Sequence, residues 1–180
     1  MSFRFEKLSM LVVEDTQPMQ KLLVSVLEAL GIKNIQTCTN GEDAFRQFCR
    51  NNHDLVLSDW AMAPMDGIEL TRLIRKSPLT PNRLAPVILI TGYSAWPRVE
   101  EARDAGVTEF LVKPFTANDL ARRIAHVINK PRDFIETQDF FGPDRRRRRD
   151  IETEYNGPPR RAEDRAIKPK ANFDLGFKGA

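Results

Sequence analysis

Three acidic residues stand directly after two apolar runs of the sequence. Glu14 and Asp15 follow the run LSMLVV at residues 8–13, and Asp59 follows DLVLS at residues 54–58. Continuous apolar runs of this length are typical of strands buried on both faces of a parallel sheet. If both runs belong to one such sheet, the three carboxylates meet at the edge where the strands end. Neighbouring carboxylates repel one another unless a cation intervenes, and a set of oxygen ligands completed by water suits Mg²⁺.

A hydroxyl group and an ammonium group occupy the same kind of position. Thr91 ends the run APVILIT at residues 85–91, and Lys113 follows EFLV at residues 109–112. A carboxylate held beside Mg²⁺ and a lysine can act as a nucleophile toward a phosphoryl group. The metal and the lysine would neutralise the charge on the phosphoryl oxygens, and Thr91 could bond an oxygen of the product. The pattern therefore predicts a magnesium-dependent phosphoryl acceptor.

Helical periodicity separates these strands. Residues 17–30 carry one apolar stripe that predicts an amphipathic helix. Its members are Met19, Leu22, Leu23, Val26, Leu27 and Leu30. After a short strand at residues 34–37, further helices are predicted to begin at the cap residues Asn40, Asp66 and Thr116, and a weaker helix covers residues 97–105. Strict strand–helix alternation with short connections predicts a parallel sheet covered by helices on both faces.

Four short motifs lie on these strand ends. They are VVED at residues 12–15, SDWAMAPMDG at 58–67, TG at 91–92 and KPF at 113–115. In order and spacing, residues 7–130 closely resemble the receiver domain of two-component response regulators, the CheY-like stand-alone type included. The resemblance implies an α/β fold, a doubly wound (βα)5 flavodoxin-like architecture with a five-stranded parallel sheet. It also implies phosphorelay signalling without a separate catalytic domain, so the protein is not expected to be an enzyme.

The resemblance implies a role for each acidic residue. Asp59 would be the phosphoacceptor, with a histidine kinase or a histidine phosphotransfer protein as donor. Asp15 and Asp59 would bind Mg²⁺ directly, together with the backbone carbonyl of Ala61. Glu14 would hold the metal through water, at a position where many members have Asp and where Glu is a common variant.

The remaining motif residues would read out the phosphoryl group. Lys113 would contact it, and Pro114 would follow a cis peptide bond, which is costly except before proline. Phosphorylation would draw Thr91 inward and let Phe110, the switch aromatic, fill the vacated space. The fourth helix, fifth strand and fifth helix would shift between two packings and present a face to a downstream protein. Whether two copies pair through this face is left open.

The departures from the family pattern are few. Ala63 stands where many members have proline, and Pro64 follows one place later. Ala61 and Tyr93 stand at two positions that tune the phosphoryl lifetime in the family. Tyr93 is followed by Trp96-Pro97, for which an exposed partner anchor and local packing are both open interpretations.

The pattern changes after Lys130. Residues 131–180 form an Arg/Pro-rich segment with few aliphatic residues, whose composition predicts a mostly disordered tail. Its aromatic residues could dock the first part back onto the domain. They are Phe134, Phe140 and Phe141. GPDRR at 142–146 and GPPRR at 157–161 form a loose repeat. Fifty residues of this composition cannot form an attached output domain, so the output is expected to pass through a partner protein.

Five consecutive arginines at residues 145–149 raise the alternative of a nucleic-acid-binding regulator that uses the tail as its effector. The tail argues against it, because 12 Lys/Arg are opposed by 10 Asp/Glu, whereas non-specific binding needs many uncompensated phosphate contacts. Between Arg145 and Arg165, Tyr155 is the only aromatic side chain that could stack on a base. A receiver that no longer accepts phosphate and acts as a scaffold is a third alternative, opposed by the intact acidic cluster.

Composition excludes several other classes. No apolar run approaches the ~20 residues of a membrane helix, and the N-terminus does not read as a signal peptide, so a cytoplasmic protein is expected. Two cysteines, Cys38 and Cys49, cannot form a four-cysteine zinc site and are interpreted as packed thiols. Trp60 and Met62 are interpreted as loop packing beside the site, and His53 and His126 as surface or packing residues.

Overall fold

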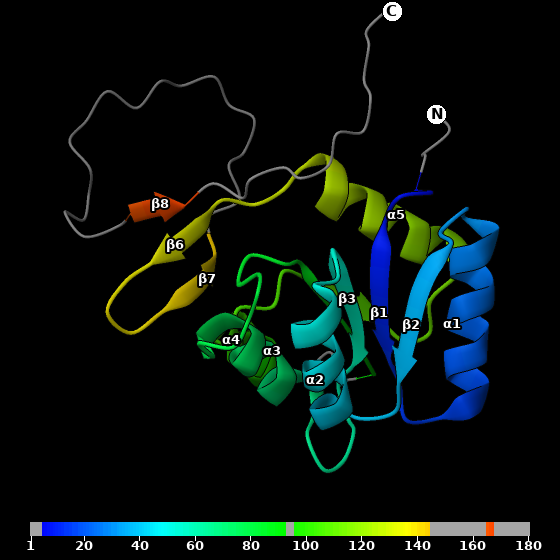
Figure 1. Ribbon diagram of the computed structural model, residues 1–180, viewed down its shortest axis with the longest axis horizontal. Coiled ribbons are helices and arrows are strands. Elements are labelled where there is room, and N and C mark those ends of the chain that lie inside the picture. Colours follow the sequence, from blue (N-terminus) through cyan, green and yellow to red (C-terminus); the bar gives the residue numbers. More distant parts are fainter. Residues whose placement is uncertain (1–4, 93–95, 145–164, 168–180) are drawn as a thin grey trace, which may run out of the picture.

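The computed structural model describes residues 5–92, 96–144 and 165–167 of the chain. Its main element is a five-stranded parallel sheet in the order β2-β1-β3-β4-β5. The strands are β1 (Ser9–Val13), β2 (Asn34–Cys38), β3 (Leu55–Asp59), β4 (Val87–Thr91) and β5 (Glu109–Val112). The helices are α1 (Gln17–Ala29), α2 (Gly41–Asn51), α3 (Gly67–Lys76), α4 (Trp96–Ala105) and α5 (Ala117–Asn129). The predicted doubly wound (βα)5 architecture is confirmed (Figure 1).

Both faces of the sheet are covered by helices, because the strands alternate between two apolar clusters. In β1, Met10 and Val12 belong to a core with α1 and α5, whereas Leu11 and Val13 belong to a core with α2 and α3. A smaller third cluster lies between β4, β5 and α4 and includes Leu89. Burial on both faces explains why the strands read as continuous apolar runs rather than as alternating ones.

Side-chain caps fix where three helices begin. Asn40 Oδ1 accepts a hydrogen bond from the backbone N–H of Asp43 at 2.9 Å, which starts α2. Asp66 forms a capping box with Glu69 at the start of α3, and Thr116 forms one with Asp119 at the start of α5. These caps satisfy backbone donors that the first helical turn leaves unpaired, and the predicted helix starts are confirmed.

Leu22 does not belong to the buried stripe of α1 as predicted. Its side chain is 54% exposed, whereas Leu23 and Leu27 are buried in the core beneath α1. The reason is geometric: a helix on the surface of one sheet buries a stripe narrower than the six-residue set, and Leu22 lies on the edge of it.

Part of the predicted tail is folded. β6 (Phe134–Glu136) and β7 (Phe141–Pro143) form an antiparallel hairpin, and β8 (Arg165–Ile167) pairs with the other edge of β6. The hairpin lies beside α3 and α4 (Figure 1). Phe134 and Phe141 are 2% and 7% exposed and serve as the anticipated anchors. The arginine run and the second repeat, at residues 157–161, lie outside the described residues.

Within the residues that the structure describes, no helix is long and apolar enough to cross a bilayer. Cys38 and Cys49 are both free thiols, and burial raises the pKa of Cys38 to about 11. A thiol with a raised pKa is a weak nucleophile at neutral pH, so the interpretation of Cys38 as a packing residue fits.

Candidate functional site

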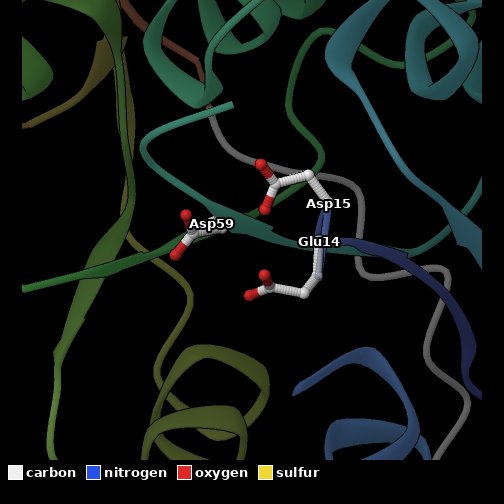
Figure 2. Close-up of side chains that lie close together, drawn as sticks. All are labelled: Glu14, Asp15 and Asp59. Atoms are coloured by element: carbon white, nitrogen blue, oxygen red, sulfur yellow. The ribbon is translucent and has the colours of Figure 1, made fainter. Parts of the chain in front are cut away.

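Three carboxylates gather at the carboxyl ends of β1 and β3. Glu14 and Asp15 directly follow β1, and Asp59 is the last residue of β3; each offers an oxygen, and these oxygens lie within 4.8 Å of one another. Figure 2 shows the three side chains reaching into one space. Together with Lys113 they form what we call the acidic cluster. The sequence predicted this convergence from the parallel arrangement of the strands.

Glu14 is buried and accepts hydrogen bonds from its neighbours. It is 1% exposed, and its Oε1 accepts hydrogen bonds from the backbone N–H of Thr16 at 3.1 Å and from its hydroxyl at 2.6 Å. The amide of Gln20 donates to the backbone carbonyls of Glu14 and Cys38, at 3.2 and 3.0 Å. These contacts hold the start of the loop that follows β1, and with it the Glu14 carboxylate.

The Asp59 carboxylate is held at both oxygens. Its Oδ1 lies 2.5 Å from Lys113 Nζ, and its Oδ2 accepts a hydrogen bond from the backbone N–H of Ala61 at 3.2 Å. Gly67 begins the next helix against it, and a Cβ at Gly67 would lie 2.4 Å from the backbone oxygen of Asp59. A side chain at this position would therefore displace the acceptor strand end, which explains the glycine of the second motif.

Charges within the cluster shift two pKa values. The pKa of Asp15 is raised by partial burial first and then by its neighbours Glu14 and Asp59. For Lys113, burial acts to lower the pKa, but the hydrogen bond and charge of Asp59 together with Glu14 outweigh it and raise the pKa. The cluster thus holds three carboxylates against one ammonium group, a charge excess that favours a bound cation.

The donor set fits Mg²⁺. All three side chains offer carboxylate oxygens, and Glu14 Oε2 is buried without a hydrogen-bond partner, 3.5 Å from Lys113 Nζ. This oxygen lies in an ion pair with Lys113 but accepts no hydrogen bond, which leaves it capacity for a further ligand. Mg²⁺ prefers a few carboxylates with water completing the shell, so the three carboxylates together could hold this ion.

The other residues predicted to respond to a phosphoryl group lie on β4 and β5, the next two strands of the sheet. Thr91 ends β4 with 1% exposure, and its carbonyl accepts a hydrogen bond from the backbone N–H of Lys113 at 2.7 Å. The peptide bond between Lys113 and Pro114 is cis. Phe110, in β5, is half-buried against the apolar cluster between the sheet and α4. A second cis peptide bond, before Pro64, was not predicted.

Further residues were interpreted from the sequence as packing, surface or partner-binding residues, and the structure describes some of them. Trp60 and Met62 are buried, at 4% and 8% exposure, as loop packing beside the site. His53 is 2% exposed and its Nε2 lies 2.9 Å from Gln36 Oε1, whereas His126 is exposed on α5. Tyr93 and the side chains of Trp96-Pro97 lie outside the described residues.

Sequence reasoning missed the two residues that position Glu14. Thr16 and Gln20 were not singled out, although each has a local signal. Gln20 is a polar side chain next to the apolar stripe of α1, one turn after the acidic pair. From this position its amide donates back to the carbonyls of Glu14 and Cys38.

Comparison with known proteins places this geometry in a family. The profile described as the response regulator receiver domain matches residues 10–125. Chemotaxis protein CheY-3 of Vibrio cholerae is 30% identical over 125 residues, which cover 69% of this chain and 95% of the relative. The chain therefore belongs to the response regulator receiver domain family, a family of signalling domains in two-component systems.

Two solved structures share the fold. The receiver domain of a sensor histidine kinase from Pseudomonas aeruginosa PAO1 is 29% identical with a TM-score of 0.60, covering 66% of this chain and 95% of its own. That structure holds a magnesium ion coordinated in its active-site cleft. CheY in the CheX–CheY–BeF3–Mg complex of Borrelia burgdorferi is 27% identical with a TM-score of 0.61, covering 67% and 88%.

Proposed function

We propose that the protein is a phosphorylation-controlled signalling protein whose Asp59 accepts a phosphoryl group from a histidine kinase or a histidine phosphotransfer protein. One observation carries the proposal: Glu14, Asp15 and Asp59 converge at one sheet edge, and Lys113 Nζ lies 2.5 Å from the Asp59 carboxylate. Two similar structures hold Mg²⁺, one of them with BeF3, which is consistent with the proposal.

The chain's own residues orient the acceptor. Contacts from Lys113 and from the backbone N–H of Ala61 hold both Asp59 oxygens, so the carboxylate is positioned before any donor arrives. An Asp59 oxygen forms the new bond to phosphorus while the bond from phosphorus to the donor imidazole nitrogen breaks, and the imidazole leaves with the electron pair. Lys113 then passes from the carboxylate to a phosphoryl oxygen and balances its charge.

Asp15, Asp59 and the Ala61 carbonyl would hold Mg²⁺ directly, and Glu14 would contribute through water. When bound, the ion would neutralise developing charge on the phosphoryl oxygens. The chain's contribution is to exclude competing conformations: the buried Glu14 and the capped loops fix the ligand oxygens in place. Thr91 is buried at the adjacent strand end, where its hydroxyl would bond an oxygen of the acyl phosphate.

The signal would pass to a partner protein through the face formed by α4, β5 and α5. Phosphorylation adds about −1.5 to −2 charge at Asp59, which would draw Thr91 inward and shift the packing of Phe110. On this face β5 already exposes Val112, at 46%. CheY of Borrelia burgdorferi forms a complex with CheX, and a protein partner is proposed here by analogy.

Acetyl phosphate tests the acceptor assignment directly. With Mg²⁺ present, the intact mass of the wild type should rise by one phosphoryl group, and that of Asp59→Asn should not. Asp54→Asn is a matched control, because Asp54 is a carboxylate at the opposite end of β3. Because some receivers react only with their protein donor, phosphohistidine transfer is the second arm; no mass gain in either arm contradicts the proposal.

A further inference from the structure

A fully buried arginine lies at the end of the sheet opposite the acidic cluster. Arg75, in the last turn of α3, is 0% exposed. Its Nε donates to the carbonyl of Gly106 at 3.0 Å, and its Nη1 donates to the carbonyls of Arg83 and Ala85 at 2.8 and 2.7 Å. Burial, and next the charge of Arg83, lower the pKa of Arg75 to about 9. The acceptors that its guanidinium bonds are all neutral, three backbone carbonyls and the Thr108 hydroxyl.

The β6–β7 hairpin completes the cover over this charge. The ring of Phe134 lies 5.1 Å from the Arg75 guanidinium carbon, and the ring of Phe141 lies 3.8 Å from that of Arg83. Arg83 in turn donates from Nε to the backbone oxygen of Arg75 at 2.6 Å. Two arginines from the α3–β4 region and two phenylalanines from the hairpin therefore form one stack, which holds the hairpin by cation–π contact and apolar burial.

The hairpin also touches the turn that joins α4 to β5. A Cβ on Gly142 would lie 3.0 Å from the Cα of Gly106, and a Cβ on Gly106 would lie 3.2 Å from the Phe141 carbonyl oxygen. Arg132 Nη1 donates to the carbonyl of Thr108 at 3.2 Å. Two glycines face each other because the two backbones pass too close for side chains.

The turn that contacts the hairpin belongs to the connection between α4 and β5, the elements proposed to shift on phosphorylation. It ends α4 at Ala105 and leads into β5, which carries Phe110 and ends one residue before Lys113. In the conformation described, Lys113 pairs directly with the Asp59 carboxylate, and the hairpin is docked on the α4–β5 turn of this same conformation; a phosphoryl group on Asp59 would replace that ion pair. Any shift of α4 relative to β5 must either carry the hairpin with it or break its contacts, because packed interfaces do not deform continuously.

We infer that the hairpin, residues 131–144, is an intramolecular partner of the switch: it binds the α4–β5 turn more tightly when Asp59 is unphosphorylated, and phosphorylation weakens this docking. The inference rests on the proposed function and adds a regulatory contact to it. A hairpin that only buries Arg75 would dock equally in both states, and the experiment separates the two cases.

A change in hairpin docking would also affect the chain connection that contains the arginine run at residues 145–149. The run lies in the connection between β7, which ends at Pro143, and β8, which begins at Arg165, and both strands pair with β6. Both ends of the connection are therefore attached to the same small sheet. A change in hairpin docking would move those ends together.

Hydrogen–deuterium exchange on the full-length wild type gives the first readout. Beryllium fluoride with Mg²⁺ serves as the phosphoryl mimic, and Asp59→Asn serves as the control that should not respond. We expect exchange in residues 134–143 to become faster with the mimic. Unchanged or slower exchange there, with the mimic bound, overturns the inference.

The affinity for the mimic gives the second readout, because coupling between two sites is reciprocal. Phe134→Leu/Phe141→Leu keeps apolar bulk but removes both rings from the arginines, and Phe45→Leu makes the same change on α2, away from the turn. We expect the hairpin variant to bind beryllium fluoride about fivefold or more tightly, in the usual range of such couplings, and Phe45→Leu to match the wild type.

The outcomes distinguish the two levels of the account. Equal or weaker binding by the hairpin variant overturns the inference alone. A wild type that does not bind the mimic contradicts the proposed function, and the inference with it. Should the variant fail to fold, the exchange measurement on the wild type still decides, since it needs no substitution.

Discussion

The two ends of one sheet treat charge in opposite ways. At the carboxyl end, three carboxylates face a single lysine, and Asp15 remains exposed with a raised pKa. At the amino end, Arg75 is fully buried, yet its guanidinium nitrogens bond to backbone carbonyls and its face is covered by Phe134. The first end is electrostatically incomplete, with an excess of negative charge, whereas at the second end backbone carbonyls satisfy the hydrogen-bond donors of a buried cation.

The contrast shows how stability and function are divided within the fold. The carboxyl edge gathers three carboxylates against one lysine, as expected of a site that binds ligands. At the amino edge, Arg75 is buried against backbone carbonyls and against the ring of Phe134, and the contact with Phe134 helps to hold the hairpin in place. Substitutions at the two ends should therefore have opposite effects on the free energy of unfolding.

The largest expected effect is at Arg75. Arg75→Gln leaves buried carbonyls without donors and a cavity under Phe134, so the free energy of unfolding should fall by about 3–5 kcal/mol. Urea denaturation followed by circular dichroism measures it. Arg72→Gln is the control on the same helix: its ion pair with Glu101 is half-exposed, so its loss should cost about 0–1 kcal/mol. Equal losses of stability in the two variants would contradict the idea that the burial of Arg75 makes it important for stability.

Gly106→Ala should come next. Gly106 has a φ of +93°, and a Cβ there would lie 3.0 Å from Arg75 Cγ. Left-handed backbone strain and displacement of the hairpin should together cost about 1–3 kcal/mol. Thermal unfolding measures the loss. Gly92→Ala is the matched control, because a Cβ at Gly92 meets nothing within 4 Å. A similar loss of stability in this control would show that the close contacts of Gly106 are not the cause.

Asp15→Asn should act in the opposite direction. Because its folded pKa is raised, ionised Asp15 opposes folding above that pKa, and its neutral replacement should stabilise the metal-free protein, by a small amount since water screens an exposed carboxylate. The same change should weaken stabilisation by added Mg²⁺. Chemical denaturation with and without Mg²⁺ tests both effects. Loss of stability in the variant without Mg²⁺ would contradict the view of this end as electrostatically incomplete.

The smallest expected effect is a pH dependence at His53, beside the amino end of β3. Burial lowers its pKa, and the charge of Asp54 opposes this only in part. A lowered folded pKa means that stability is present above the unfolded pKa of about 6.5 and is lost as pH falls below it. The free energy of unfolding should decline between pH 7 and 5, less steeply in His53→Gln; identical slopes would exclude His53 as the cause.

The sequence predicted those features that depend on neighbouring residues, and it did not predict those that depend on contacts between distant parts of the chain. The sheet, its helices and the position of Asp59 follow from apolar runs, caps and strand ends, all of which are local. The exposure of Leu22 could not be predicted, since it depends on how α1 lies on the sheet. The hairpin was hidden because Phe134 and Phe141 find their partners far away in the chain, at Arg75 and Arg83, and composition records no such pairing.

The central claim is that the acidic cluster positions Asp59 to accept a phosphoryl group. Borohydride reduces an acyl phosphate of aspartate to homoserine, releasing phosphate, and so marks the acceptor covalently. After phosphorylation by acetyl phosphate or a phosphohistidine donor, peptide mass mapping should find homoserine at position 59 and at no other carboxylate. Homoserine at Asp15 or elsewhere, with position 59 unmodified, would contradict the account.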